Sequence, residues 1–363
     1  MKPPAEVVYE RELNALRAND RGPKPSNWRL SPQFVRIFIL GSPQPFLLHG
    51  EEIVVQRKFF GDETLVERCI ITLAGSRGLL LVGEPGTAKT MLSELLAAAI
   101  SGTSLNAIQG TAGTTEEAMK YSWHYPLLLS HGPTKEALVP APLYTGMSKG
   151  KITRFEEISR CPSEIQDALI SIMSEKIMLI PELGEEGVLY ASPGFNVIAT
   201  ANSRDRGVHE MSGALKRRFN FETVMPIQDV RLEADIIKRA ARAEDARIAA
   251  LHDDEVVELL ATIFVELRKG ITKEGYRIEM SGTIMSTAEA AAVYTQSLMS
   301  AHYFGKRRVM MEDVVGHLIG AVAKDSADGV SKLRHYFQTV IKSRSTEEGG
   351  RWTELYEAHS KTH

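Results

Sequence analysis

Residues 83–90 combine glycine, lysine and threonine in an order suited to binding phosphate. The octapeptide Gly83-Glu84-Pro85-Gly86-Thr87-Ala88-Lys89-Thr90 follows the apolar run 79–82, and apolar residues at helical spacing begin at Met91. A loop between a strand and a helix turns backbone N–H groups toward an oxyanion, and the helix dipole adds to their attraction. Lys89 would reach the β- and γ-phosphates, and Thr90 would offer its hydroxyl to Mg²⁺. The pattern therefore predicts a site for a nucleotide with Mg²⁺.

One position departs from the usual G-x-x-x-x-G-K-[ST] pattern. Ala88 stands where the second glycine is expected, and its methyl group is a small steric burden. The alternative interpretation is an ordinary Gly-Pro turn between a strand and a helix. The Lys-Thr pair at the start of the expected helix favours the nucleotide.

Two adjacent glutamates form the next polar pair at the end of an expected strand. Glu156 and Glu157 come directly after the strand expected over 152–155, which would place them beside Thr90. In phosphate-loop enzymes the first acid binds Mg²⁺ through water, and the second acts as general base or orients the attacking water. The first acid is usually the shorter aspartate, and Arg154 is unexpected in a strand buried on both faces. The alternative is a pair of acidic residues at a helix N-terminus.

Two further polar sites follow in the chain. Asn202 ends an apolar strand expected over 197–200, where an amide can orient water, although asparagine is also common at simple strand ends. Arg217 and Arg218 lie in a basic stretch, and a guanidinium given to a neighbouring subunit's γ-phosphate would stabilise transition-state charge. Arg218 is the first candidate for this role and Arg217 the second; the alternative is a basic surface patch.

The elements that must position these residues alternate as in an α/β fold. Short apolar strands and helical stretches over 51–226 predict a parallel sheet, with insertions at 114–150 and 177–195, the second a β-hairpin. Residues 227–342 have helical periodicity and predict an all-helical domain. The remaining parts are an N-terminal extension, 1–50, with a strand expected over 34–40, and a polar C-terminal tail, 343–363.

Composition and charge indicate which partners and which cellular compartment to expect. The 363 residues carry a formal net charge of -3, which gives no overall attraction to nucleic acid or anionic lipid. The two cysteines have no paired spacing, and no apolar run approaches the length that spans a bilayer. We therefore expect a soluble cytoplasmic protein with reduced cysteines and no membrane partner.

Taken in order, these motifs resemble those of AAA+ ATPases, and more narrowly the MoxR branch, whose loop carries alanine at the position of Ala88. Phe60 and Gly61 are similar to the segment that lines the adenine pocket in that family. The insertions match the helix-2 insert and pre-sensor hairpin of the branch, and residues 305–314 are similar to a stretch of its helical lid. The resemblance covers about residues 55–320.

The resemblance implies a homo-hexameric ring that hydrolyses ATP with Mg²⁺ at its subunit interfaces. It implies a protein client, which the ring remodels or matures, and a partner protein with a von Willebrand factor A domain. The lid segment 281–288 has no arginine where the family usually presents one to the nucleotide. Two alternatives therefore stay open: a nucleotide-gated assembly scaffold with little turnover, and a DNA-acting motor, which the acidic hairpin disfavours.

Overall fold

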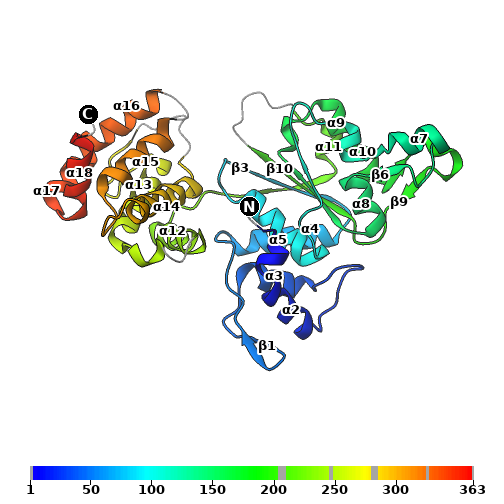
Figure 1. Cartoon of the computed structure of the whole chain (residues 1–363), viewed down its shortest axis with the longest axis horizontal. Coiled ribbons are helices and arrows are strands. Elements are labelled where there is room, and N and C mark those ends of the chain that lie inside the picture. The colour runs from blue at the N-terminus through cyan, green and yellow to red at the C-terminus, as the bar shows by residue number, and fades with distance from the viewer. Residues whose placement is uncertain (1–2, 203–209, 245–247, 279–284, 324–326, 362–363) are drawn as a thin grey trace. The chain divides into compact units, whose positions relative to one another are not determined.

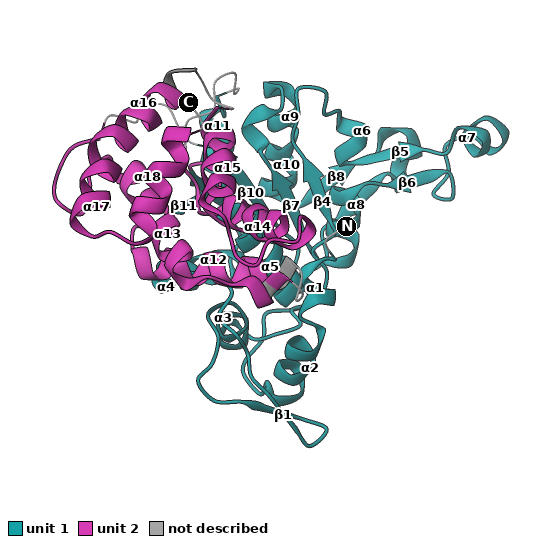
Figure 2. Ribbon diagram, turned by 60° about the vertical axis from the view of Figure 1, so that its left-hand side comes forward, with its two compact units in different colours: residues 1–83, 88–224 teal, residues 84–87, 225–363 magenta. Residues whose placement is uncertain are grey.

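The computed structural model describes residues 3–202, 210–244, 248–278, 285–323 and 327–361, which form two compact units (Figure 1). The first unit comprises residues 1–83 and 88–224, and the second comprises 84–87 and 225–363 (Figure 2). The sequence placed the boundary between core and helical domain at 226, two residues from the boundary between the units.

A five-stranded parallel sheet organises the first unit. Its order is β11-β3-β10-β7-β4, and every neighbouring pair is parallel. The strands are β3 (Gly78–Gly83), β4 (Ala107–Gln109), β7 (Ile152–Glu156), β10 (Asn196–Asn202) and β11 (Phe219–Thr223). The chain thus has the expected α/β fold with a parallel sheet; β11 was not among the expected strands.

Apolar side chains cover both faces of this sheet. Along β3, Leu79 and Leu81 belong to one buried cluster and Leu80 to another, because successive side chains of a strand point to opposite faces. Both clusters are completed by helices and short 3₁₀ turns. These elements are α4 (Glu63–Ala74), α5 (Lys89–Ser101), η1 (Ile158–Arg160), α9 (Ser163–Asp167), α10 (Leu169–Glu175) and α11 (Gly213–Lys216).

The N-terminal extension is part of this unit's core. Leu13, Leu16 and Phe38 are fully buried in the same cluster as Leu92 of α5. The elements of the extension are α1 (Ala5–Val8), α2 (Glu10–Asn19), α3 (Pro32–Leu40), β1 (Phe46–Leu48) and β2 (Glu51–Ile53). The strand expected over 34–40 was wrong: proline in the first turn favours a helix start, and the apolar run packs as helix α3.

The two insertions form small antiparallel pairs. The first contains α6 (Glu116–Met119), β5 (Tyr121–Trp123), α7 (Tyr125–His131), β6 (Leu138–Pro140) and α8 (Pro142–Lys149), with β5 paired to β6. The second is a hairpin of β8 (Ile177–Leu179) and β9 (Val188–Tyr190), joined by a 3₁₀ segment, η2 (Pro181–Glu186). The hairpin expected within 177–195 is confirmed.

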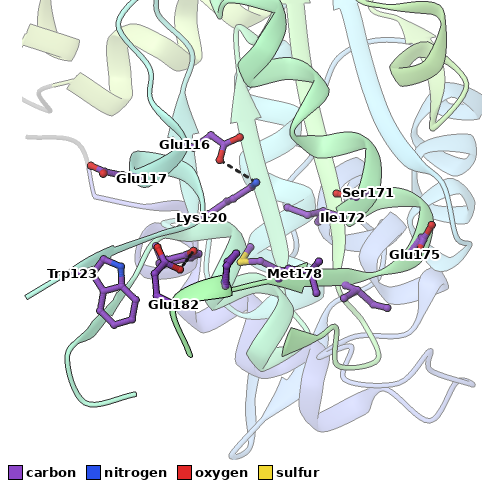
Figure 3. A pocket seen from close by; sticks show the side chains of 13 residues that line it. Glu116, Glu117, Lys120, Trp123, Ser171, Ile172, Glu175, Met178 and Glu182 are labelled. Carbon is purple, nitrogen blue, oxygen red and sulfur yellow. Dashed lines mark hydrogen bonds and ion pairs between the residues drawn. The ribbon is translucent and has the colours of Figure 1, made fainter. Parts of the chain in front are cut away.

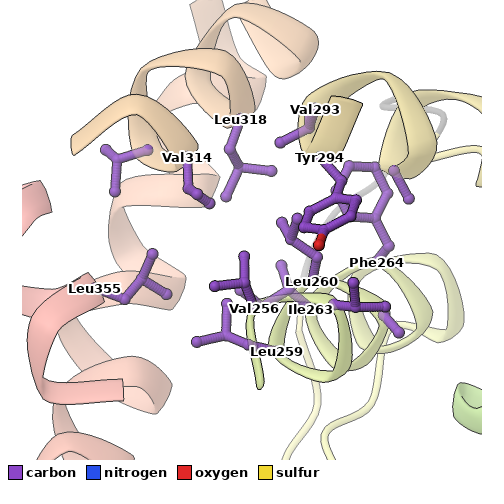
Figure 4. Close-up of a cluster of buried hydrophobic side chains, with 14 of the residues drawn as sticks. Val256, Leu259, Leu260, Ile263, Phe264, Val293, Tyr294, Val314, Leu318 and Leu355 are labelled. Carbon is purple, nitrogen blue, oxygen red and sulfur yellow. The ribbon is translucent and has the colours of Figure 1, made fainter. Parts of the chain in front are cut away.

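After residue 225, the regular elements among the described residues of the second unit are helices, apart from one isolated β-bridge. Its apolar helical stripes form one core, in which Phe264, Tyr294, Leu318 and Leu355 are fully buried (Figure 4). The elements are α12 (Val230–Glu244), η3 (Ile248–Leu251), α13 (Asp254–Lys269), α14 (Thr287–Tyr303), α15 (Met311–Ala323), α16 (Ala327–Tyr336), the π-helix η4 (Phe337–Ile341), α17 (Lys342–Glu347) and α18 (Arg351–Lys361).

The polar C-terminal region is therefore not a loose tail. Residues 342–361 form helices α17 and α18, and Leu355 and Ala358 lie in the core of the second unit. The sequence did not indicate these helices, because α18 buries only a few apolar residues along one narrow face. Among the described residues, no helix is long and apolar enough to cross a membrane.

Candidate functional site

Three neighbouring strands bring the candidate residues to one edge of the sheet. In the β3–β10 pair Asn202 lies opposite Gly83, and in the β7–β10 pair Ala199 lies opposite Phe155, one residue before Glu156. Because the strands are parallel, their carboxyl ends meet at this edge, which is where open α/β sheets bind ligands. Gly83, Glu156 and Asn202 are thus collected by strand register.

The loop after β3 turns back on itself before α5 begins. The hydroxyl of Thr87 donates to the carbonyl of Glu84 at 2.8 Å, and Ala88 adopts the left-handed conformation with φ 65° and ψ 21°. Left-handed backbone is costly for a residue with a Cβ and free for glycine. The cost of alanine at this position is therefore conformational, where we expected a steric one.

Lys89 lies buried at the start of α5, with its ammonium 3.0 Å from the carbonyl oxygen of Gly83. Its charge is thus held at the carboxyl end of β3. Two other loop residues, Pro85 and Gly86, lie at its partly exposed turn, whereas Met91 lies in the first turn of α5 and packs against the buried cluster of the first unit. Thr90, the next residue, is exposed.

Glu156 is buried and contacts Thr90, as the motif order predicted. The Thr90 hydroxyl donates to Oε2 of Glu156 at 3.0 Å, and the Thr200 hydroxyl donates to the same oxygen at 2.8 Å. The other oxygen, Oε1, accepts from Ser93 at 2.5 Å and from Arg154 at 2.8 Å. A hydroxyl and a carboxylate side by side are the oxygen donors that Mg²⁺ prefers.

Glu157 follows in a left-handed turn, with φ 55° and ψ 46°. Its backbone N–H donates to the Thr200 hydroxyl at 2.9 Å, and its carboxylate pairs with Arg160 at 2.8 Å. Its side chain is 32% exposed, so the carboxylate remains open to water. Thr200 thus contacts both acids: its hydroxyl donates to the carboxylate of Glu156 and accepts from the backbone N–H of Glu157.

The turn that contains Glu156 and Glu157 depends on Gly110, which directly follows strand β4. The N–H of Gly110 donates to the carbonyl of Glu156 at 2.7 Å. A Cβ at position 110 would lie 2.4 Å from the carbonyl oxygen of Glu157, a contact that real side chains do not make. Only glycine permits this close approach of two backbones.

The two basic candidates differ in their surroundings. Arg218 donates to Ser174 Oγ at 2.8 Å and to the carbonyl of Ala214 at 3.0 Å, so contacts within the same chain orient it. Arg217 is exposed. Both residues follow α11 directly before β11, so the sheet fixes the point from which either side chain projects.

The segment expected at the adenine lies before α4. Phe60 is half-buried, and the guanidinium of Arg57 lies 5.7 Å from the centre of its ring. Gly61 is exposed, and a Cβ there would lie 2.7 Å from the ring of Phe59. The lid segment 281–288, with no arginine, lies partly outside the described residues.

Sequence reasoning missed three residues that hold the two acids: Ser93, Thr200 and Arg154. Ser93 could have been found, because it is three residues after Thr90 and so shares its face of α5. Thr200 lies one residue beyond the register partner of Phe155. Only the fold brings Arg154 and Ser93 together, 61 residues apart in the chain.

A pocket of about 640 Å³ lies between the two insertions of the first unit (Figure 3). Apolar side chains, among them Trp123, Ile172, Met178 and Leu179, line much of it, and its acidic lining residues are Glu116, Glu117, Glu175 and Glu182. Lys120 pairs with Glu116 at 3.2 Å. Burial, with a hydrogen bond to Glu182, raises the pKa of Tyr121, another lining residue, to about 12. The acidic lining makes this pocket unsuitable for phosphate.

Comparison with known proteins identifies the family. An AAA domain of the dynein-related subfamily matches residues 78–219, and a YehL-like AAA+ ATPase C-terminal domain matches residues 231–362. The uncharacterized protein YehL of Escherichia coli K12 is 46% identical over 363 residues, covering 99% of this chain and 97% of that protein. This chain belongs to the family of YehL-like AAA+ ATPases. The family assignment accounts for the phosphate loop and for the helical unit together.

More distant proteins share part of the chain or its fold. The uncharacterized Staphylococcus haemolyticus protein SH1500 is 27% identical over 221 residues, 61% of this chain and 79% of that protein. The RuvB Holliday junction branch migration motor of Thermotoga maritima has 16% identity and a TM-score of 0.43, covering 82% of this chain and 86% of its own. NtrX of Brucella abortus, solved with ATP, has 10% identity and a TM-score of 0.42, covering 66% and 48%. The likeness to these two structures concerns the fold alone.

Proposed function

We propose that this protein is an ATP phosphohydrolase. The observation that carries the proposal is the convergence of Lys89 and Thr90 with Glu156, Glu157 and Asn202 at the carboxyl ends of neighbouring parallel strands. Each residue type there has a part in phosphoryl transfer to water. The family assignment supports the same reaction.

Each residue has a separate part in the proposed reaction. Lys89 binds the β- and γ-phosphates, and Thr90 with Glu156 holds Mg²⁺, which when bound neutralises charge on the phosphate oxygens. Glu157, with its carboxylate open to water, and Asn202 orient the attacking water, and Glu157 accepts its proton. The loop N–H groups and Lys89 stabilise the charge that develops on the phosphate.

The test compares Glu157→Gln with the wild type. Glutamine keeps the size of the side chain but cannot accept the proton, so we expect turnover to fall about 10²-fold or more with unchanged affinity for ATP. Lys89→Ala should abolish nucleotide binding itself. Equal steady-state rates for Glu157→Gln and the wild type would reject the catalytic assignment.

A scaffold that binds ATP with little turnover is the second candidate, because Glu157 is paired with Arg160 at 2.8 Å. A carboxylate held in an ion pair is less free to turn toward an attacking water. Arg160→Gln distinguishes the two: an enzyme limited by this pair gains turnover, whereas a scaffold stays inactive and still assembles on ATP.

We also propose that the protein acts as a homo-hexamer of the MoxR type, in which Arg218 or Arg217 completes the site of the neighbouring subunit. Arg218 has little to do in its own subunit's chemistry. Mixing provides the test: inactive Arg218→Ala subunits supply intact nucleotide sites, and inactive Lys89→Ala subunits supply intact arginines. Restored turnover in the mixture supports a shared site, and the same mixture made with Arg217→Ala decides which arginine serves.

The client is proposed to be a protein, recruited with a partner that has a von Willebrand factor A domain and handled in the cytoplasm. The acidic pocket between the insertions favours a basic protein segment over nucleic acid, since carboxylates repel phosphate. Binding to single- and double-stranded DNA over a salt series is the test. Salt-sensitive binding of DNA would favour a DNA-acting motor and reject the protein client.

A further inference from the structure

Arg154 is a buried guanidinium on an interior strand of the sheet. It is 8% exposed and lies in β7, which pairs with β10 on one side and β4 on the other. Such a strand normally contains apolar residues, because the desolvation of a charge is costly. Its presence next to the proposed metal-binding acid therefore requires a physical reason.

The side chain of Arg154 makes four hydrogen bonds. It donates from Nε to Ser93 Oγ at 3.0 Å, from Nη1 to the Ser104 carbonyl at 2.8 Å, and from Nη2 to the Thr90 carbonyl at 3.3 Å. Nη2 also donates to Oε1 of Glu156 at 2.8 Å. Four of its five N–H groups are thus used, three on parts of the chain other than β7, so the guanidinium has one fixed orientation.

This orientation determines how the Glu156 carboxylate lies. Oε1 accepts from Arg154 and Ser93, and Oε2 accepts from Thr90 and Thr200, so each oxygen has two donors. A glutamate side chain has one more rotatable bond than an aspartate and needs more contacts to hold one rotamer. The donors on Oε1 supply them at the oxygen that does not contact the Thr90 hydroxyl.

We propose that Arg154 is a positioning residue for the metal-binding carboxylate. It holds Oε1 of Glu156 against Ser93 and so turns Oε2 toward the Thr90 hydroxyl, the side on which Mg²⁺–ATP binds. This inference rests on the proposed function, because it requires a nucleotide with Mg²⁺ at Lys89 and Thr90. A guanidinium suits the role because its planar fork reaches several acceptors at once, whereas a lysine ammonium is a single point.

A shorter acid at position 156 should not serve as well. Aspartate lacks one methylene, so a carboxylate that reaches Thr90 would leave Arg154 and Ser93 without their acceptor. We therefore expect Glu156→Asp, although it restores the more usual residue, to weaken the coupling between Mg²⁺ and nucleotide. Weakened metal binding of about 10- to 100-fold is typical when a residue behind a ligand is removed.

The experiment measures binding, without turnover. A fluorescent ATP analogue is titrated into the full chain with Mg²⁺ and with EDTA, and the ratio of the two affinities is the Mg²⁺ coupling. We expect Arg154→Met to keep the affinity in EDTA within about threefold of wild type and to reduce the coupling about tenfold or more. Arg36→Met, which removes an exposed arginine paired with Glu63 and Glu67, is the control and should keep the full coupling.

Glu156→Gln and the double variant Arg154→Met with Glu156→Gln complete a double-mutant cycle. The double variant removes both buried charges, so it can still be measured if Arg154→Met alone, with Glu156 left unpaired, folds poorly. If Arg154 acts through Glu156, the double variant loses no more coupling than Glu156→Gln. Additive losses, or full coupling in Arg154→Met, would overturn the positioning role and leave the proposed function intact. Absence of nucleotide binding by the wild type would overturn both.

Discussion

At the scale of single residues, the strained position in the phosphate loop offers a direct test. Ala88 has φ 65°, which costs an L-residue about 1–2 kcal/mol and glycine almost nothing. Glycine also raises the conformational entropy of the unfolded chain, which lowers the free energy of unfolding by about 0.4–1 kcal/mol. We therefore expect Ala88→Gly to raise the free energy of unfolding of the first unit by up to about 1 kcal/mol.

The matched control for Ala88→Gly makes the same change in ordinary helix. Ala97 lies inside α5 and is buried, so Ala97→Gly should lower the free energy of unfolding by about 1 kcal/mol or more. Urea unfolding measures both variants. A loss in Ala88→Gly as large as that in Ala97→Gly would contradict the assignment of strain.

A second residue-scale test uses pH in the second unit. The hydrogen bonds from Arg344 lower the pKa of Glu274 from 4.5 to about 2. A lowered folded-state pKa stabilises the fold above the unfolded value, and this contribution is lost as the pH falls from about 4.5 toward 2. We expect Glu274→Gln to cost about 1 kcal/mol at pH 7, a reduced value because a third of the side chain is exposed.

Denaturant unfolding of Glu274→Gln and wild type at several pH values measures this contribution. The difference between them should shrink as the pH falls below 4.5. Glu357→Gln, at an exposed position of α18, should differ from wild type by less than about 0.5 kcal/mol at any pH. A cost for Glu274→Gln that stays constant down to pH 2 would rule out the ion pair as its cause.

At the scale of elements, the site depends on how closely the end of β4 approaches the end of β7. A Cβ at Gly110 would meet the backbone of Glu157 at 2.4 Å, and a backbone cannot move aside as a flexible side chain can. Gly110→Ala should therefore displace the turn that carries Glu157. A displacement of about 1 Å can cost about 10²-fold in rate, so we expect turnover to fall strongly.

Nucleotide affinity should change little in Gly110→Ala, because Lys89 and Thr90 lie at the start of α5, away from the end of β4. Gly113→Ala is the control: the nearest atom to its Cβ would be Thr111 Oγ1 at 3.9 Å, an ordinary contact. Steady-state turnover and nucleotide titration separate the two effects. Equal turnover in Gly110→Ala and Gly113→Ala would show that the close approach is unimportant for catalysis.

Local sequence patterns were sufficient to predict the strands that carry the motifs. Buried parallel strands read as short apolar runs, so Leu79–Val82 and Ile152–Phe155 were found within one residue of β3 and β7. The same rule failed for Phe34–Leu40, because a short apolar run does not distinguish a buried helix from a strand. In β11, Phe219 and Phe221 alternate with polar residues, so no apolar run marked the strand and it was overlooked.

The contacts inside the site could not be predicted in the same way. The order of the motifs was enough to place Glu156 beside Thr90, since both follow strands of one parallel sheet. The clamp of Arg154 and Ser93 on Glu156 depends on which face of α5 meets β7, a property of packing. Sequence could only mark Arg154 as out of place in a buried strand.

At the scale of the whole molecule, the N-terminal residues are tied to the nucleotide-binding unit by a buried charge. The Lys58 ammonium contacts Glu12 at 2.5 Å and the carbonyls of Phe38 and Gln56 at 2.9 Å. Its side chain is 3% exposed. Burial lowers the pKa of Lys58, and Glu12 opposes that shift. Lys58 also lies two residues before Phe60, which is expected at the adenine pocket.

Removing the acid of this pair should therefore destabilise the whole first unit. Glu12→Gln leaves Lys58 buried without its counter-charge, which typically costs about 3–5 kcal/mol, whereas the exposed Glu10→Gln should cost less than about 0.5 kcal/mol. The double variant Glu12→Gln with Lys58→Met removes both charges and should recover most of the loss. Urea unfolding followed through Trp28, buried in the same unit, measures all three. If Glu12→Gln matched Glu10→Gln, the first fifty residues would be an appendage; a large loss that the double variant reverses makes them part of the nucleotide-binding fold.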